Sequence, residues 1–349
     1  MDSMISDALA ALLADRCGAD VVRAVESGGS AAELWQAISE AGFADAMVSE
    51  AKGGAGLSTE AVAGCWMLAG RHAVPLPLSE TMIARALLTE QAITVPDTPI
   101  ALGIGHPTPA GTLRAAGVSG GRTAGAVLVT AVGDTWLLDT ASARSERCAF
   151  ELDLTLEWPK SAWAGAPRLP VSLDTRLAQA LVLSLQIAGA LDTVFRRSLA
   201  WANEREQFGK PIGKFQAIQH QLALMAEESF AATMAARIAC LPAPNRAALA
   251  TASPGMVGVL AGTEPLRVAT AKARTSEAAL LVAQMAHAIH GAIGFTHEFD
   301  LQILTRRLHA WRQTAGSESA WHDQIGRALL SPETTSLDLL RMTTDVAAG

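Results

Sequence analysis

The sequence predicts a mostly α-helical protein with a small β insert, and three observations support this fold class. Half of its 349 residues are hydrophobic, and the chain is rich in Ala and Leu, which favours buried helices. Apolar residues recur at helical spacing up to about residue 92 and again from about residue 172. Between these stretches lie prolines and short β-like runs. We expect an N-terminal helical domain (1–94), a middle β domain (95–168) and a C-terminal helical bundle (169–349).

Several helices are expected in the first domain. The glycines within residues 53–56 interrupt the helical pattern, and either Ser58 or Thr59 can cap the helix that follows. Pro75 and Pro77 mark the end of that helix, because proline does not continue a helix.

The middle domain is expected to contain short strands. Residues 126–130 and 135–138 are β-like runs, and Gly133 with Asp134 forms a turn between them. From about residue 172 the pattern is helical again. We expect helices at 173–203, 216–240, 266–290 and 301–330, the last range holding one or two, and a loop at Pro242, Pro244 and Pro254.

Composition excludes several classes of protein. The net charge is −7 and there is no Lys/Arg run, so we expect no nucleic-acid partner. The longest apolar stretch, 177–191, is shorter than the ~20 residues that span a bilayer and contains two glutamines, so we expect no membrane partner. The N-terminus lacks the basic region of a signal peptide. A reduced cytoplasmic interior suits four cysteines that lack metal or disulfide spacing: Cys17, Cys65, Cys148 and Cys240.

Residues 204–220 form the most informative motif. Arg205 lies where one helix pattern stops, and glycines and proline at 209–213 break the chain before the next helix. An arginine at a helix end beside an aromatic residue, here Phe208, suits a phosphate, because its planar fork donates two parallel hydrogen bonds. The alternative is a helix–turn–helix corner with a solvated arginine.

This motif resembles the signature of the acyl-CoA dehydrogenase family, Arg-x-x-Phe-Gly-x-Pro-Ile followed by Phe-Gln-Ala-Ile-Gln-His. Residues 290–301 resemble the family's Gly-Phe block, most closely that of its bacterial steroid-degrading branch, and residues 50–56 resemble a third block. The resemblance covers most of the chain except roughly 95–165. It implies a helical domain, a β domain and a four-helix bundle, and a flavoenzyme activity that removes hydrogens from Cα and Cβ of an acyl-CoA.

The residues expected to act as the catalytic base are missing. Such a reaction needs a carboxylate to take the Cα proton. The two family positions for it correspond to Ala315 and Gln179, and neither side chain can act as a base at pH 7. Residues 176–190 contain no Asp or Glu. Glu318, about one helical turn beyond Ala315, is a possible substitute, with a solvated surface carboxylate as the alternative.

The flavin-binding parts of the β domain are also altered. The family's Thr-Glu-Pro, Gly-Ser-Asp and Trp-Ile-Thr elements are absent, and the domain is abbreviated. Trp136 can stand in for the missing aromatic or can be an ordinary core tryptophan. We therefore expect this chain not to hold an isoalloxazine ring in its own β domain.

The resemblance implies that the other half of a flavin site is retained. In the family, FAD binds across a dimer interface, and the neighbour's bundle holds its diphosphate and adenosine. Ala288 and Ala292 depart from the Gln and Gly that are common in the family. The matching positions are Arg205, Gln207, Phe208, Gln216, Ala288, Gly291, Ala292 and Ser317.

Two further pairs of residues lie beside the motifs. His220 and His290 can contact a phosphate or can be core or interface histidines. Arg306 and Arg307 resemble family positions that face neighbouring subunits or the CoA, with a solvated helix face as the alternative.

These observations favour a short subunit of a heteromeric (α2β2) FAD-dependent acyl-CoA dehydrogenase acting on a bulky, steroid-like acyl-CoA. A longer family member is expected to bring the base and the flavin loop. Two alternatives stay open: a homomeric dehydrogenase that uses Glu318 as its base, and a flavin-free scaffold or regulatory subunit.

Overall fold

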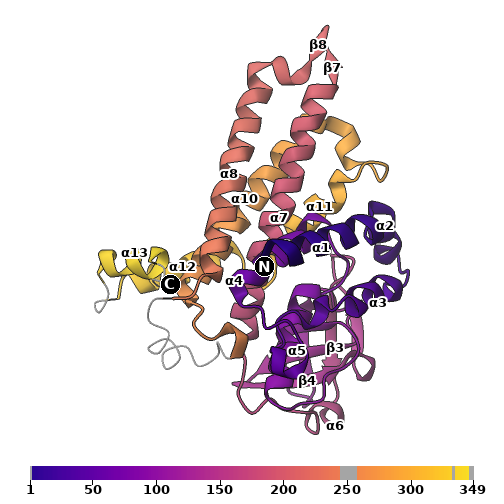
Figure 1. The fold of residues 1–349 in the computed structure, drawn as a ribbon, viewed down its shortest axis with the longest axis vertical. Helices are drawn as coiled ribbons and strands as arrows, with labels where there is room; N and C mark the ends of the chain where they lie inside the picture. Colours follow the sequence, from indigo (N-terminus) through magenta and orange to yellow (C-terminus); the bar gives the residue numbers. More distant parts are fainter. Residues whose placement is uncertain (1, 244–257, 332–334, 346–349) are drawn as a thin grey trace.

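The computed structural model describes residues 2–243, 258–331 and 335–345, and the N-terminal part is helical as expected (Figure 1). Ser58 is the residue that caps α4, because its side chain accepts a hydrogen bond from the Ala61 amide at 3.2 Å. The five helices are α1 (Asp2–Arg16), α2 (Ala19–Glu26), α3 (Ala32–Glu40), α4 (Thr59–Arg71) and α5 (Leu78–Glu90).

A six-stranded sheet follows, in the order β4-β3-β1-β2-β6-β5. β1 and β3 are parallel, and the other neighbours are antiparallel. Both predicted strands are present, and the hairpin between them turns at Val132 and Gly133, whose φ angles are 49° and 85°. The strands are β1 (Ile100–Pro107), β2 (Leu113–Val118), β3 (Ala126–Ala131), β4 (Asp134–Asp139), β5 (Arg144–Arg147) and β6 (Leu154–Trp158), with the short helix α6 (Lys160–Trp163) after them.

The rest of the described chain is a helical bundle. Two long neighbouring helices, α7 and α8, are joined at the far end of the bundle by a two-stranded hairpin, β7 (Glu206–Gln207) and β8 (Lys210–Pro211) (Figure 1). Pro244 and Pro254 of the predicted loop lie outside the described residues. The helices are α7 (Thr175–Glu204), α8 (Gln216–Cys240), α10 (Pro265–His290), α11 (Leu301–Gln313), α12 (Glu318–Leu329) and α13 (Ser336–Thr344).

Close contact between α4 and α7 joins the N-terminal helices to the bundle. A Cβ atom added at Gly70 would lie 1.9 Å from the Gln186 carbonyl oxygen, and one added at Gly189 would lie 1.9 Å from the Met67 carbonyl oxygen. Only glycine allows the two backbones to approach this closely. The mostly helical fold class with a small sheet is therefore confirmed, and the sheet lies at the end of the bundle opposite the hairpin (Figure 1).

Among the residues that the structure describes, two helices are long and apolar enough to cross a membrane by length and composition alone: α7 and the stretch from Pro265 to Phe295. In α7, 89% of the most apolar window is buried inside the protein, against 44% in the second helix. Burial in a bundle core accounts for the apolarity of α7, so length and composition are weak evidence of a span.

Candidate functional site

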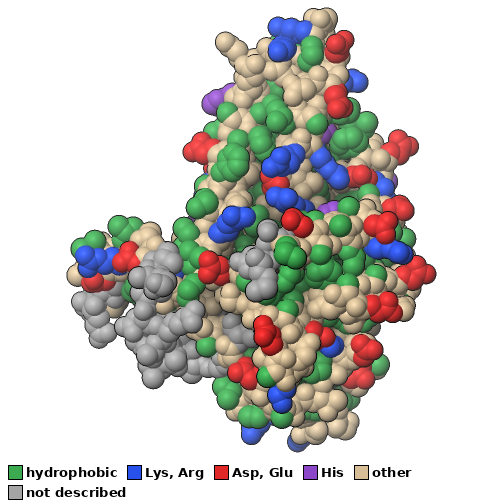
Figure 2. All heavy atoms as spheres, in the orientation of Figure 1, with side chains coloured by type: hydrophobic (Ala, Val, Ile, Leu, Met, Phe, Trp, Pro, Cys, Tyr) green, Lys and Arg blue, Asp and Glu red, His purple; other side chains and the backbone are tan. Residues whose placement is uncertain are grey.

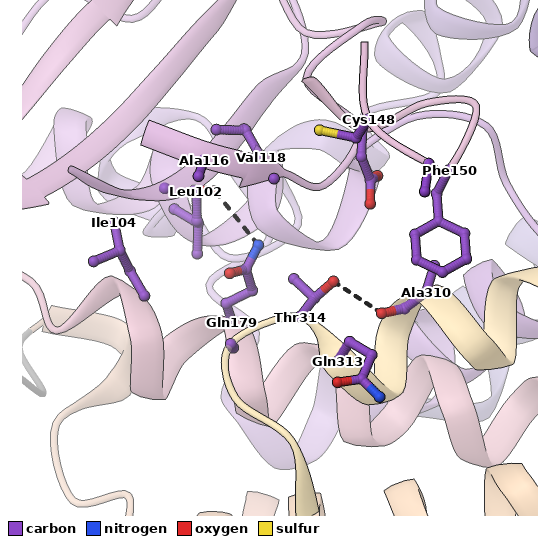
Figure 3. Close-up of a pocket in the computed structure, with 15 residues that line it drawn as sticks. Leu102, Ile104, Ala116, Val118, Cys148, Phe150, Gln179, Ala310, Gln313 and Thr314 are labelled. Carbon is purple, nitrogen blue, oxygen red and sulfur yellow. Dashed lines mark hydrogen bonds between the residues drawn. The ribbon is translucent and has the colours of Figure 1, made fainter. Parts of the chain in front are cut away.

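A cavity of about 360 Å³ lies where the sheet, α7 and the end of α11 meet (Figure 3). Its volume is near the lower end of the ~300–1,000 Å³ typical of small-molecule sites. Its walls are formed by residues of β1 and β2, the segment after β5, one turn of α7 and the C-terminal turn of α11; they include Leu102, Val118, Cys148, Phe150, Gln179 and Thr314.

The two positions expected to carry a base both line this cavity. Gln179 lies on the first turns of α7, and its side-chain amide donates a hydrogen bond of 3.4 Å to the Leu102 carbonyl oxygen (Figure 3). Ala315 follows α11 and has a φ of 60°, in the left-handed region. The structure thus brings together two residues 136 positions apart, and neither side chain accepts a proton at neutral pH.

A carboxylate that sequence reasoning missed also lines the cavity. Asp153 precedes β6, is buried, and accepts a hydrogen bond from the Gly120 amide at 3.3 Å. Burial raises the pKa of Asp153 to about 6, while the charge of Arg307 opposes that rise. It lies in the part of the chain outside the family resemblance, so no motif identified it.

The loop after α11 is held in place from behind by a buried lysine. The Lys272 ammonium donates to the Ser276 hydroxyl at 3.0 Å and to the carbonyl oxygens of Trp311, Arg312 and Gly316 at 3.0, 3.1 and 3.3 Å. Burial lowers the pKa of Lys272 to about 7. These contacts cap the C-terminus of α11.

An arginine holds the same loop from the side of α7. The Arg176 guanidinium donates to the Ala315 carbonyl oxygen at 3.1 Å and lies 4.5 Å from the centre of the Trp321 ring. Together with Lys272, it fixes the backbone at the position where a base was expected.

Glu318 lies at the first position of α12 and is paired with Arg312. It is not among the residues that line the cavity. Its carboxylate is therefore directed to the end of α11, and a role as a substitute base would require a rearrangement of this loop.

The signature residues lie on the β7–β8 hairpin at the tip of the bundle. Arg205 is exposed, its carbonyl oxygen accepts from the Ile212 amide at 2.8 Å, and its guanidinium lies 5.9 Å from the Trp201 ring centre. Phe208 is 93% exposed and has a φ of 53°. Gln207 is exposed beside it. Within the described part of the chain no side-chain hydrogen bond or ion pair holds the Arg205 guanidinium, and an exposed phenylalanine three residues away indicates a contact surface.

The second block packs against the last turns of α7 through stacked aromatic rings. α10 ends at His290, and Trp201 stacks on that imidazole with ring centres 5.4 Å apart and an interplanar angle of 18°. Gly291 follows, with a φ of 68° and no atom within 4 Å of an added Cβ. Trp201 therefore links the Arg205 guanidinium, on one side, to the end of α10 just before Gly291, on the other.

The other predicted cofactor-binding residues divide between the two ends of the bundle. Gln216 begins α8 next to the hairpin, and Ala288 and Ala292 flank Gly291; all three are exposed. Ser317 instead precedes α12, beyond the far end of α11 and next to the cavity loop. The eight residues do not form one cluster within this chain.

The structure also places the remaining residues. His220 is exposed, whereas His290 is buried and bonded through Nδ1 to the Ala286 carbonyl oxygen at 2.7 Å. The expectation that Arg306 and Arg307 lie on a solvated face or meet a neighbour is wrong for Arg307, which is buried and lies 3.1 Å from Glu26. Glu26 comes from a distant helix, which the sequence spacing does not reveal.

The residues at the tip fit the diphosphate and adenosine half of FAD. They offer an exposed guanidinium, an exposed aromatic ring and an open glycine backbone, which suit a phosphate and a nucleoside. The cavity at the other end fits the flavin ring less well. Trp136 packs edge-on against Trp163 with ring centres 5.6 Å apart and is not one of the lining residues.

Residues 174–330 match the family described as acyl-CoA dehydrogenase, C-terminal domain. Acyl-CoA dehydrogenase FadE34 of Mycobacterium tuberculosis is 29% identical over 78% of this chain, but the match spans only 39% of that relative's length. Acyl-CoA dehydrogenase IpdE2 of the same organism is 27% identical over 89% of this chain and 91% of its own length.

Solved structures share the fold. A chain of the ChsE4-ChsE5 complex from Mycobacterium tuberculosis superposes with a TM-score of 0.77 at 17% identity, covering 95% of this chain and 98% of that one. A chain of the Tcur3481-Tcur3483 steroid ACAD has a TM-score of 0.75 at 22% identity, covering 93% and 96%. At this identity the likeness is one of fold.

Proposed function

We propose that this chain is the cofactor-completing subunit of a heteromeric FAD-dependent enzyme of the acyl-CoA dehydrogenase family, whose C-terminal domain matches residues 174–330. In this proposal the chain supplies the diphosphate and adenosine half of a shared FAD site and does not supply the catalytic base. When bound, FAD would supply the acceptor for the hydride that leaves Cβ of the acyl-CoA.

The observation that carries the proposal is the pairing of a retained tip with an incomplete cavity. Arg205 and Phe208 are exposed at the tip, where a second chain can reach them. Gln179 and Ala315 meet in the chain's own cavity, where a base would have to lie. A chain that keeps one half of a site and lacks the other needs a partner that carries the missing half.

Each tip residue has a defined role in this proposal. Arg205 would donate paired hydrogen bonds to the diphosphate. The open backbone at Gly291 would let the diphosphate approach closely. Phe208, which is 93% exposed in the single chain, would pack against the partner, and its ring would leave water. The stacked Trp201 and His290 hold the hairpin and the glycine block at a fixed distance.

The partner in this proposal is a longer family member that carries a carboxylate base and a flavin loop. The substrate in this proposal is a bulky acyl-CoA, such as a steroid-derived thioester. The named two-component structures, the ChsE4-ChsE5 complex and the Tcur3481-Tcur3483 steroid ACAD, support such an assembly for this fold.

Co-expression followed by a visible spectrum tests the proposal. The chain with a longer family member should give a yellow complex, and the chain alone should be colourless or insoluble. Arg205→Ala should weaken flavin binding by roughly 1.5–3 kcal/mol, the value of a charge-assisted contact. Arg16→Ala is the matched control, since Arg16 is an exposed arginine on α1, away from the hairpin. Full flavin occupancy and turnover by the isolated chain would exclude this function.

Two variants separate the alternatives. Glu318→Gln should leave turnover of the complex unchanged, because Glu318 pairs with Arg312 and does not line the cavity. Loss of turnover in that variant would favour Glu318 as the base. A scaffold subunit should tolerate Arg205→Ala with no change in flavin content of the complex.

A further inference from the structure

A groove of about 650 Å³ lies between α1, α2, the end of α4, α7 and the start of α11, away from the flavin half-site and the cavity. In Figure 2, Lys and Arg side chains gather on the visible face over the middle of α7. Three arginines line the groove: Arg71, Arg196 and Arg197. We call it the arginine groove.

One carboxylate in the groove serves two arginines. Asp192 Oδ2 lies 2.9 Å from Arg71 Nη2, and Asp192 Oδ1 lies 2.9 Å from Arg196 Nε. Asp192 is largely buried, whereas the Arg196 side chain is 71% exposed and Arg71 41%. Both guanidinium groups therefore keep N–H donors that face the groove or solvent.

The second carboxylate is shared in the same way. Asp300 pairs with Arg23 and lies 3.9 Å from Arg197 Nη1. The Nε atom of Arg23 is buried and has no hydrogen-bond partner among the described residues. Arg23 does not line the groove, so three lining arginines meet two lining carboxylates, which leaves an excess of one positive charge in the groove on a chain whose net charge is −7.

The surroundings favour an organic anion over a bare ion. Apolar side chains form part of the groove wall, including Val22, Ile303 and Leu304. Burial lowers the pKa of His72, which also lines the groove, and the charges of Arg71 and Arg197 lower it further. The arginine charges that add to this shift would also attract an anion.

We propose that the arginine groove binds the phosphate groups of a nucleotide-sized ligand. Guanidinium groups pair with phosphate oxygens through two parallel hydrogen bonds, and the volume suits a small molecule. Arg196 lies nine residues before Arg205, about 13 Å along the helix, so the groove and the flavin half-site are separate places on α7. None of the half-site residues lines the groove.

Calorimetric titration tests this proposal. The full chain, in the form in which it purifies, is titrated at 0.15 M chloride with pyrophosphate, ADP and coenzyme A as probes. Arg71→Gln and Arg196→Gln should each weaken binding roughly tenfold or more. Asp192→Asn should strengthen binding, because it removes a carboxylate that competes for both arginines. If Asp192→Asn only damaged the fold, it would weaken binding of the probe instead. Arg16→Gln, outside the groove, is the control.

Titration in the Arg205→Ala background separates this site from the flavin half-site, since binding to the groove should persist there. Tighter binding of ADP or of coenzyme A than of pyrophosphate would identify the organic part of the ligand. Equal affinity for all three would assign the site to the diphosphate group alone.

Three results would overturn the proposal: no binding at millimolar probe, equal weakening by Arg16→Gln, or weakening by Asp192→Asn. Binding by the free chain that is lost in the purified complex would also overturn it. In that case an acidic segment of the partner is the occupant of the groove.

Discussion

Replacing Lys272 with methionine should release the loop that follows α11. Methionine nearly matches lysine in length but donates no hydrogen bonds. The change removes the donor to the Trp311, Arg312 and Gly316 carbonyl oxygens and to the Ser276 hydroxyl. Ala315, which lines the cavity, lies within the segment that these bonds hold.

The magnitude follows from which acceptors keep another donor. The Gly316 carbonyl also accepts from the Trp321 indole at 3.2 Å, and the Arg312 carbonyl from the Ser276 hydroxyl at 3.5 Å. The Trp311 carbonyl has no second side-chain donor among the described residues. In Lys272→Met the Trp311 carbonyl loses its side-chain donor, and the other two carbonyl oxygens each lose one of two donors. We estimate that this costs about 2 kcal/mol, or roughly a 30-fold increase in local opening.

Hydrogen exchange measured by mass spectrometry on peptides covering residues 311–318 is the assay. At pH 6, below the Lys272 pKa of about 7, the wild-type ammonium is charged and exchange should be about 30-fold slower than in Lys272→Met. Lys214→Met, at an exposed lysine, is the matched control. Unchanged exchange in Lys272→Met, or the same change in Lys214→Met, would refute the reasoning.

The pH dependence of global stability gives a second check on Lys272. Burial lowers its folded pKa from 10.5 to about 7, so between these values the unfolded lysine keeps a proton that the folded one has lost. The free energy of unfolding should therefore rise with pH over this window, by at most about 1.4 kcal/mol per pH unit. Lys272→Met should lack this rise.

Two further predictions concern buried and backbone features. Burial raises the pKa of Glu80 from 4.5 to about 7, and its Oε2 has no partner among the described residues, so wild-type stability should fall as pH rises from 4.5 to 7. Glu80→Gln should be more stable than wild type above pH 7, by up to about 3 kcal/mol in urea unfolding; equal stability at pH 5 and pH 8 would contradict this. Gly291→Ala should cost about 1–3 kcal/mol in the same assay, because φ is 68° although a Cβ would meet no atom. Gly165→Ala, equally open but without a positive φ, should cost little, and equal costs would argue against backbone strain.

Much of the fold could be predicted because it depends on short-range patterns. The helical periodicity at 173–203 and 216–240 matches α7 and α8 to within about two residues, since proline and glycine punctuate the chain locally. Ser58 as a cap and the β3–β4 hairpin were likewise local features. The order of the six strands was not predicted, because strand pairing depends on long-range contacts that a pattern does not encode.

By itself, the sequence determined that the chain carries the acyl-CoA dehydrogenase signature at Arg205 and no carboxylate at 179 or 315, because residue identity and spacing suffice for both. Only the tertiary structure decided that Gln179 and Ala315 face one cavity, that Asp153 joins them, and that Ser317 lies far from the Arg205 hairpin. Those relations arise where separate elements pack together. The excess charge of the arginine groove has the same origin, since its three arginines come from α4 and α7.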